Sequence, residues 1–302
     1  ACEQPVPIGT GDAVKCGIHE VKDASKVLVL YGDVPLIKQN TIEELINASG
    51  DGLSILTTEL DDPYGYGRVK KNPEGYATGI IEEKDASNEE KEIKEVFTGI
   101  LCSSTNILKD SLSEIDNNNA AGEFYLTDIV SIMNNKGIKI NTYLASNDEV
   151  KGANSKKELA QLEAIYRSMK VEDLLNMGIT ISDPNRLDVR GDVECGKDCS
   201  IDVNVILEGK IKLGDNVSIG ANCIIKNTSI GSNSKIDAFS HIDGALISDS
   251  CIIGPYARLR EGSQIETSAK VGNFVETKNI VLGKGSKANH LTYLGDTEVG
   301  KE

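Results

Sequence analysis

A six-residue repeat runs from Val189 to Gly300 and restricts the possible folds of this chain more than any other feature. One apolar residue recurs every six positions, and glycine often follows it directly. This period fits neither a helix nor a long alternating strand, but it is typical of hexapeptide repeats, in which stacked coils bury a continuous column. With two one-residue slips, the frame passes through Val189, Cys195, Ile201, Leu207, Leu213, Ile219, Ile225, Ile230, Ile236, Ile242, Ile247, Ile253, Leu259, Ile265 and Val271, and it returns at Leu282, Ala288, Leu294 and Val299.

A second register of small or apolar residues follows the frame four positions later. Side chains two residues apart on a strand share a face, so both registers are predicted to point into the coil while the residues between them point out. The members are Cys199, Val205, Ile211, Val217, Cys223, Ser234, Ser240, Leu246, Cys251, Ala257, Ser263 and Ala269. Two registers that agree make chance regularity a poor explanation, and they predict one shared interior.

The composition excludes several classes of function. A net charge of −15 without any basic stripe argues against a nucleic-acid surface, so a bound polyphosphate needs a local pocket of positive groups or a metal. No apolar run is long enough to span a bilayer, so no membrane partner is expected. The seven cysteines are odd in number and form no Cys-x-x-Cys pair, which predicts a reduced, cytoplasmic protein with neither a disulfide framework nor a zinc site.

The chain up to residue 144 has the pattern of an α/β domain. Val27–Tyr31 is a short apolar run typical of a buried parallel strand, and Asp33 follows at the carboxyl end, where ligands bind in open α/β sheets. A capping box at Thr41–Glu44 predicts the next helix. Further strands are predicted at 53–60, 76–82, 96–103 and 138–144, and another helix at 123–134.

Polar, glycine-containing motifs follow these elements, and each alone is a weak signal. Gly9 before a predicted helix suits a close approach to phosphate, although a plain strand-to-helix turn has the same pattern. Asp33 at a strand end is often only a cap. In chain order the motifs are Gln4 with Gly9-Thr10, Tyr31-Gly32-Asp33, Tyr64-Gly-Tyr-Gly67-Arg68, Ile81-Glu82-Glu-Lys84-Asp85, Thr98-Gly99 and Gly122-Glu123-Phe-Tyr-Leu-Thr-Asp128. Their order resembles the sugar-nucleotidyltransferase family.

Together with the repeats, the motifs resemble the family of bifunctional N-acetylglucosamine-1-phosphate uridyltransferases/glucosamine-1-phosphate acetyltransferases over essentially the whole chain. The resemblance implies a Rossmann-like α/β nucleotidyltransferase domain at residues 1–154, a linker helix at 155–178 and a left-handed parallel β-helix acetyltransferase domain at 179–302. Ser155 and Glu158 form a capping box where the linker helix begins. The resemblance also implies a chain truncated at both ends, with two partial domains and little or no activity by itself.

For the first domain, the resemblance implies uridylyl transfer from UTP to N-acetylglucosamine 1-phosphate with release of pyrophosphate. Asp33 and Asn154 would hold Mg²⁺, which prefers oxygen ligands and bridges phosphates. The implied substrate contacts are Gln4, Gly9, Thr10, Tyr31, Gly67, Glu82 and Asn154. Phe97 stands where the family has asparagine, so one polar contact to the sugar is missing and weaker sugar binding is expected.

For the second domain, the polar residues around the break in the repeat after Val271 are the candidates for substrate binding and catalysis. The resemblance implies that Arg260, Lys278 and Tyr293 bind glucosamine 1-phosphate, and that His290 is the general base for its acetylation by the co-substrate acetyl-CoA. Arg and Lys match a phosphate, and an imidazole can take the proton of an attacking amine near neutral pH. A lone histidine is more often a bystander, but the match to His-Leu-Thr-Tyr-Leu-Gly favours the catalytic role.

Two other functions stay open: a nucleotidyltransferase whose repeats serve only assembly and regulation, and a non-catalytic two-domain subunit that acts through partners. The His290–Tyr293 motif with Arg260 and Lys278 favours acetyl transfer over the first, and Asp33 with Asn154 argues against the second. The separate positions of the three histidines disfavour a zinc hydratase built on similar coils. The expected role is UDP-N-acetylglucosamine biosynthesis for bacterial envelope polymers, carried out by a homotrimer packed along the coils.

Overall fold

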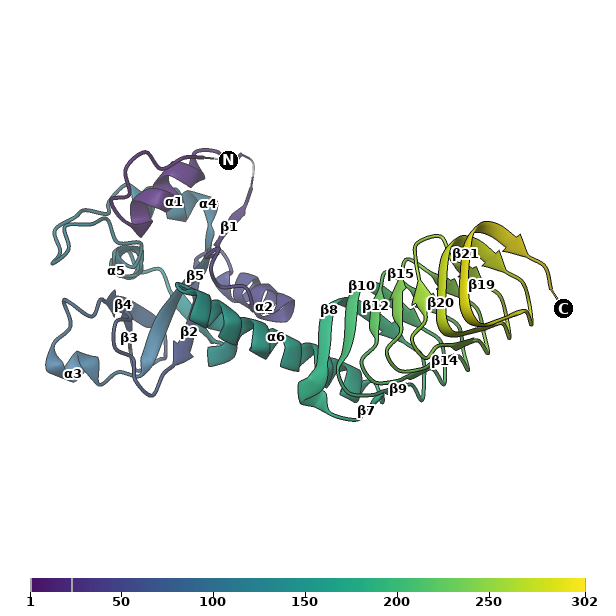
Figure 1. The fold of residues 1–302 in the computed structure, drawn as a ribbon. Coiled ribbons are helices and arrows are strands. Elements are labelled where there is room, and N and C mark those ends of the chain that lie inside the picture. Colours follow the sequence, from purple (N-terminus) through teal and green to yellow (C-terminus); the bar gives the residue numbers. More distant parts are fainter. Residues whose placement is uncertain (1, 23, 302) are drawn as a thin grey trace. The chain divides into compact units, whose positions relative to one another are not determined.

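A computed structural model describes residues 2–22 and 24–301, so the outermost residues of the two predicted domains, Ala1 and Glu302, lie outside the described part (Figure 1). The chain divides into two compact units, one up to Leu162 and the other from Glu163 on. Helix α6 (Lys156–Asn176) contains the boundary between the units. No helix within 2–22 or 24–301 combines the length and the apolar character that a membrane span requires.

The first unit is built on a six-stranded sheet in the order β4-β3-β5-β2-β6, with β1 paired to β5. Strand β6 is parallel to β2, whereas β5 is antiparallel to β1, β2 and β3. The strands are β1 (Lys26–Val29), β2 (Leu53–Glu59), β3 (Arg68–Lys71), β4 (Ala77–Ile81), β5 (Glu95–Ser104) and β6 (Ile140–Leu144). The sheet is therefore mixed, and its long strand β5 pairs with three other strands.

Helices cover both faces of this sheet. Successive residues of β2 point to opposite faces, so this strand contributes side chains to a core on each side. Leu53 and Ile55 belong to a core that includes residues of α1, α4 and α5, whereas Leu56 belongs to a second core with Leu45 of α2. The helices are α1 (Thr10–Ile18), α2 (Gln39–Ser49), α3 (Asn88–Lys91), α4 (Thr105–Leu112), α5 (Asp128–Asn135) and the 3-10 turn η1 (Asn147–Val150). The predicted α/β architecture is confirmed.

One strand prediction and one helix-cap prediction in this unit were wrong. The run Val27–Tyr31 contains β1, but this strand is half-buried and antiparallel to its partner, because an apolar run reports burial and not the direction of pairing. Helix α2 begins at Gln39 without any side-chain cap. The predicted cap residue, Thr41, is buried and donates its hydroxyl to Glu149 Oε2 at 2.6 Å, so it serves a tertiary contact instead.

The second unit is a left-handed parallel β-helix, as predicted. Ile201 pairs with Ile219, 18 residues on, and Ile219 pairs with Ile236, 17 residues on, so three hexads complete one coil. Its strands are β7 (Thr180–Ile181), β8 (Leu187–Cys195), β9 (Ser200–Ile201), β10 (Val205–Leu213), β11 (Ser218–Ile219), β12 (Ile224–Lys226), β13 (Ser229–Ile230), β14 (Lys235–Ile236), β15 (His241–Asp243), β16 (Leu246–Ile247), β17 (Ile252–Ile253), β18 (Arg258–Leu259), β19 (Gln264–Ile265), β20 (Lys270–Leu282) and β21 (Lys287–Val299). Figure 1 shows these strands stacked in successive coils.

The interior of the coils follows the two predicted registers. Ile219, Ile253 and Ile265 are at most 1% exposed and belong to one core. One assignment was wrong: Leu246 is 57% exposed, and Ala245 takes the inward position. The frame slips by one residue here, because Ile242 and Ile247 are five positions apart instead of six. The inward side chain is the one two positions before Ile247, which is Ala245.

The start of α6 also matches its predicted cap. Ser155 Oγ accepts a hydrogen bond from the N–H of Glu158 at 3.2 Å, and the Glu158 carboxylate accepts from the N–H of Asn154 at 2.8 Å. These contacts satisfy backbone donors at the helix start that have no partner inside the helix. Asn154, a predicted magnesium ligand, therefore sits at the point where the polypeptide enters α6.

Candidate functional site

The turn that leads into α1 holds three predicted nucleotide contacts together. Gln4 Nε2 donates to the carbonyl oxygen of Gly9 at 3.2 Å and to Asp12 Oδ2 at 2.8 Å. Gly9 has a φ of 133°, and a Cβ there would lie only 2.7 Å from the backbone nitrogen of Phe124, so no other residue fits. Thr10 Oγ1 accepts a hydrogen bond at 3.1 Å from a backbone N–H two residues after Phe124. The turn is thus anchored, with backbone N–H groups at the start of a helix.

Tyr31 lies where this turn meets the centre of the sheet. Its ring rests on Gly99, where a Cβ would lie 2.8 Å from the phenol oxygen and closer still to the ring. Burial, and then the charges of Glu82 and Asp33, raise the pKa of Tyr31, while a hydrogen bond with Thr10 acts in the opposite direction. The phenol therefore lies near predicted nucleotide, sugar and metal residues, namely Thr10, Glu82 and Asp33.

Gly67 and Glu82, the predicted sugar contacts, lie beside each other. A Cβ on Gly67 would lie 3.5 Å from both carboxylate oxygens of Glu82. Burial raises the pKa of Glu82, and Thr127 Oγ1 donates to its Oε1 at 3.0 Å. Thr127 was not among the predicted site residues, although it lies in the Gly122–Asp128 motif. The carboxylate is thus oriented by a neighbour that comes from a distant part of the sequence.

Asp128, at the end of the same motif, is another residue that sequence reasoning missed. Helix α5 begins at Asp128, five residues later than predicted. Burial is the main cause that raises the pKa of its carboxyl to about 6, followed by the charges of Asp116, Glu82 and Asp85. These carboxylates make the surroundings of Glu82 acidic, and a phosphate ligand there requires compensating positive charge.

Asp33 lies beside the segment that leads into α6, which contains the second predicted metal ligand, Asn154. Asp33 Oδ2 lies 3.2 Å from the place that a Cβ on Gly152 would occupy, and the Asp33 carbonyl accepts from the N–H of Ala153 at 3.0 Å. The carboxylate therefore lies beside a residue only two positions before Asn154. A carboxylate and an amide oxygen suit Mg²⁺, which fills its other positions with water and substrate phosphates, so the residues fit this ion.

Phe97 lies beside Gly67, one of the predicted sugar contacts. Its N–H donates to the carbonyl oxygen of Gly67 at 2.9 Å, which places its backbone beside the predicted sugar loop. The side chain is only 7% exposed and belongs to the core shared with α1, α4 and α5. The ring therefore packs into the apolar core and offers no polar group to a sugar.

The β-helix carries a second group of predicted residues on one side, which we call the charged face. On this face Ile206, Ile224, His241 and Arg258 pair in succession, followed by Glu276 and Tyr293 in one outward row. A second outward row, which we call the charge row, lies two residues further along each coil. The charge row consists of Arg190, Glu208, Lys226, Asp243, Arg260 and Lys278.

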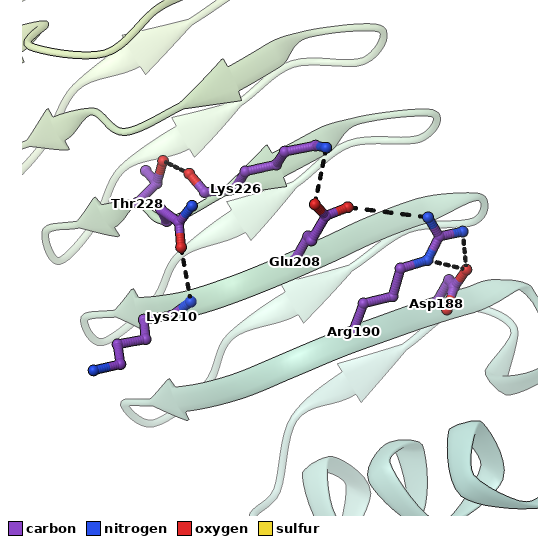
Figure 2. A network of polar contacts seen from close by, with 7 residues as sticks. Asp188, Arg190, Glu208, Lys210, Lys226 and Thr228 are labelled. Atoms are coloured by element: carbon purple, nitrogen blue, oxygen red, sulfur yellow. Dashed lines mark hydrogen bonds and ion pairs between the residues drawn. The ribbon is translucent and has the colours of Figure 1, made fainter. Parts of the chain in front are cut away.

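Figure 2 shows how the first coils neutralise the charge row. Arg190 donates to Asp188 Oδ2 at 2.6 and 2.9 Å, and its Nη1 lies 4.0 Å from Glu208 Oε2. Lys226 Nζ lies 3.0 Å from Glu208 Oε1. Opposite charges directly across paired strands stabilise a sheet modestly. Ion pairs therefore account for the alternation of sign from Arg190 to Lys226.

The alternation ends where Lys278 follows Arg260. Leu259 pairs with Thr277, so the next residues, Arg260 and Lys278, lie side by side on adjacent coils. Glu276 of the neighbouring row lies 3.2 Å from Arg260 Nη1. No carboxylate among the described residues lies within ion-pair distance of Lys278. Two adjacent cations repel each other, so this pair is a feature that a bound anion would stabilise.

Arg260 and Lys278 line a surface groove of about 660 Å³. The same groove is lined by the acidic side chains of Asp243, Glu261 and Asp296. Both signs of charge are therefore available within one groove. This arrangement suits a ligand that carries a phosphate at one position and an ammonium group at another.

Tyr293 extends this group of residues on the next coil. It pairs in register with Glu276, and Gly295 pairs with Lys278. The Tyr293 phenol lies over Gly295, which is the register partner of Lys278, although Tyr293 is not among the residues that line the groove. The structure therefore brings the three predicted phosphate contacts, Arg260, Lys278 and Tyr293, to one face.

His290 lies at the corner where the charged face begins. It is exposed, immediately precedes Leu291 with its φ of 50°, and pairs in register with Asn273. It is not among the residues that line the groove, but it belongs to the same coil as Tyr293. The imidazole is thus free to meet a ligand group that extends from the groove towards this corner.

Comparisons with known proteins cover both units. A family model described as the GMPPB C-terminal domain matches residues 189–299, which lie in the β-helix. The chain is 50% identical over 299 residues to a protein of Paraburkholderia phymatum named bifunctional protein GlmU. Proteins with the same name from Burkholderia vietnamiensis and Burkholderia orbicola are 49% and 50% identical over 299 residues. Each alignment covers 98% of this chain, which spans 66% of the length of each relative.

Proposed function

Because this chain belongs to the family of the bifunctional protein GlmU, we propose that it carries residues of two transferase sites. The site on the β-helix acetylates glucosamine 1-phosphate with acetyl-CoA. The site in the α/β unit transfers a uridylyl group from UTP to N-acetylglucosamine 1-phosphate. The two reactions together produce UDP-N-acetylglucosamine, a sugar nucleotide for bacterial envelope polymers.

The adjacent cations Arg260 and Lys278 carry the proposal for the β-helix. They interrupt a row whose charges otherwise alternate, and Lys278 has no carboxylate partner among the described residues. A phosphate monoester restores the balance of charge at this place and accepts hydrogen bonds from both side chains. The phenol of Tyr293 adds a neutral donor beside them. A sugar phosphate held there is fixed at one end of the molecule.

The acetyl transfer then follows from His290 at the corner. The amine nitrogen of the sugar attacks the thioester carbonyl carbon of acetyl-CoA, and His290 accepts the proton that the nitrogen loses. The C–S bond breaks, and the leaving thiolate takes up a proton. Binding the phosphate in the groove holds the amine in place, so much of the rate enhancement comes from positioning.

In the α/β unit, the Gly9–Thr10 turn and Gln4 hold the nucleotide, and Tyr31, Gly67 and Glu82 hold the sugar. The phosphate oxygen of the sugar attacks the α-phosphorus of UTP, and the bond to the β-phosphate breaks to release pyrophosphate. Asp33 and Asn154 would hold Mg²⁺, which would neutralise phosphate charge among these acidic residues. No covalent intermediate with the protein is required.

The experiment that tests this function measures both activities in the complete protein. His290→Ala abolishes acetyl transfer and preserves uridylyl transfer, whereas Asp33→Asn has the opposite effect. Acetyl transfer that persists in the His290→Ala protein contradicts the role of the imidazole. If both variants keep both activities, the proposed function is wrong and a partner-binding role is favoured.

The family resemblance also supports a homotrimer that forms along the coils. Light scattering of the purified chain measures this directly, and a monomer in solution contradicts it.

A further inference from the structure

Tyr293 occupies space that exists only because residue 295 is glycine. A Cβ at Gly295 would lie 2.7 Å from Cζ and 2.8 Å from Cε1 of Tyr293, and closer still to its hydroxyl oxygen. Distances this short do not occur in folded proteins, so any side chain at position 295 would displace the phenol. All three nearest atoms belong to the Tyr293 side chain and none to the backbone.

The backbone itself does not require glycine at this position. Gly295 is not among the residues with positive φ, so alanine can adopt its conformation without strain. Other glycines of the coils differ in this respect: a Cβ on Gly272 would clash with the backbone of Asn289, and the coils would have to separate. The need for glycine at 295 therefore comes from Tyr293 alone.

The space above Gly295 that the Tyr293 phenol occupies lies on the charged face. Gly295 pairs in register with Lys278, so it is the next member of the charge row after Arg260 and Lys278. The row continues here with the hydroxyl of Tyr293 in place of a side chain from position 295. With 58% of its surface exposed, Tyr293 has no burial that would hold it in this position, so the open space over Gly295 determines where the phenol lies.

We propose that Gly295 is a positioning residue that seats the Tyr293 phenol in the anion site formed by Arg260 and Lys278. This inference rests on the proposed acetyltransferase function. The seated O–H donates to an oxygen of the sugar phosphate, next to the charged donors of the two neighbouring coils. A side chain at 295 rotates the phenol away, and the site keeps its charge but loses its third donor.

A double-mutant cycle in the complete protein tests the proposal. Gly295→Ala and Tyr293→Phe each raise the KM for glucosamine 1-phosphate by about tenfold, the value of one hydrogen bond to a charged group. The double variant is no worse than either single one, because both changes remove the same O–H. Calorimetric titration with glucosamine 1-phosphate, without acetyl-CoA, shows the same loss of affinity.

Gly300→Ala is the matched control, because a Cβ at Gly300 meets no atom within 4 Å and its φ is not positive. This variant keeps the wild-type KM, and uridylyl transfer is unchanged in all variants. An unchanged KM in Gly295→Ala overturns the inference, and so does a double variant in which the two effects multiply. Wild-type protein that binds no glucosamine 1-phosphate overturns the proposed function as well, so the two failures are distinguishable.

Discussion

The guanidinium of Arg68 is nearly buried, at 2% exposure, and its Nη2 lies 2.6 Å from Glu83 Oε2. Its Nη1 donates to the carbonyl oxygen of Tyr66, and the Glu83 carboxylate also accepts from the N–H of Gly65 at 3.3 Å. The pair therefore ties both sides of the loop that contains Gly67. The hydrogen bond from Arg68 is the main cause that lowers the pKa of Glu83, so the carboxylate stays ionised at neutral pH.

Replacing Glu83 with glutamine loosens this loop without changing its size. Gly67 then moves relative to Glu82, and we expect the KM for N-acetylglucosamine 1-phosphate to rise by about tenfold, since the sugar loses an aligned contact. The KM for UTP and the rate of acetyl transfer stay at wild-type values. Steady-state kinetics with each substrate varied in turn measures the difference.

The control for this change is Glu89→Gln, on the exposed helix α3 close by in the sequence. It alters the same residue type and the same net charge without touching Arg68, and it leaves both KM values unchanged. Equal increases in the KM for sugar phosphate and UTP in the Glu83→Gln protein would show that the pair supports the whole domain and not the sugar loop.

The β-helix was predictable from the sequence because each coil repeats the same requirement. Ile219, Ile236 and Ile253 are paired residues in one stack, so an error at one coil is corrected by its neighbours. The failure at Leu246 shows the limit of this redundancy. Where the frame slips by one residue, the local period allows either Ala245 or Leu246 to point inward. Only the stacking of the coils selects Ala245.

The α/β unit was less predictable because its key contacts join distant residues. Thr41 bonds to Glu149 and Thr127 bonds to Glu82, and no local pattern indicates either pair. Strand β3 (Arg68–Lys71) was missed because three of its four residues are basic. The motif order indicated which residues to consider together, but which side chain orients which depends on tertiary packing.

Changing Lys278 to glutamate restores the alternation of the charge row. The new carboxylate would face Arg260 across one coil spacing, so we expect the free energy of unfolding to stay equal or to rise by about 0.5 kcal/mol. Binding of glucosamine 1-phosphate falls by more than about tenfold, because a carboxylate repels the phosphate. Thermal unfolding and calorimetric titration measure the two effects separately.

Lys287→Glu is the corresponding control, since Lys287 is exposed at the start of β21 and is not part of the charged face. It changes the net charge equally and leaves ligand binding intact. A Lys278→Glu protein that is clearly less stable than wild type would show that the lysine has a structural partner and is not kept for an anion.

Asp128 makes the stability of the α/β unit depend on pH. Its pKa is raised from 3.8 to about 6, so folding favours its protonated form, and the stabilisation present below pH 3.8 is lost as the pH rises through 6. Asp128→Asn removes this penalty. We expect the variant to be more stable than wild type by about 1 kcal/mol at pH 7.5, after allowing for solvent screening and for the favourable charge at a helix start.

The gain in the Asp128→Asn protein disappears below pH 4, where wild-type Asp128 is protonated in both states. Denaturant unfolding at pH 4, 6 and 7.5 follows this dependence. Asp110→Asn, at an exposed position on α4, is the control and shows no comparable change with pH. A constant difference between the Asp128→Asn protein and wild type across this range contradicts the assignment of the carboxyl.

Phe97→Asn tests whether the ring at this position limits sugar binding. The N–H of Phe97 donates to Gly67, so an amide side chain here starts from a backbone beside the sugar loop, and we expect a lower KM for N-acetylglucosamine 1-phosphate in the complete protein. The buried ring also belongs to the core, so its loss destabilises the unit by about 3 to 5 kcal/mol. Kinetics must therefore be measured below the midpoint of thermal unfolding.

Phe97→Leu is the control because it keeps an apolar side chain. This variant retains more of the stability and leaves the KM for N-acetylglucosamine 1-phosphate unchanged. An equal KM in the leucine and asparagine variants means that position 97 does not contact the sugar.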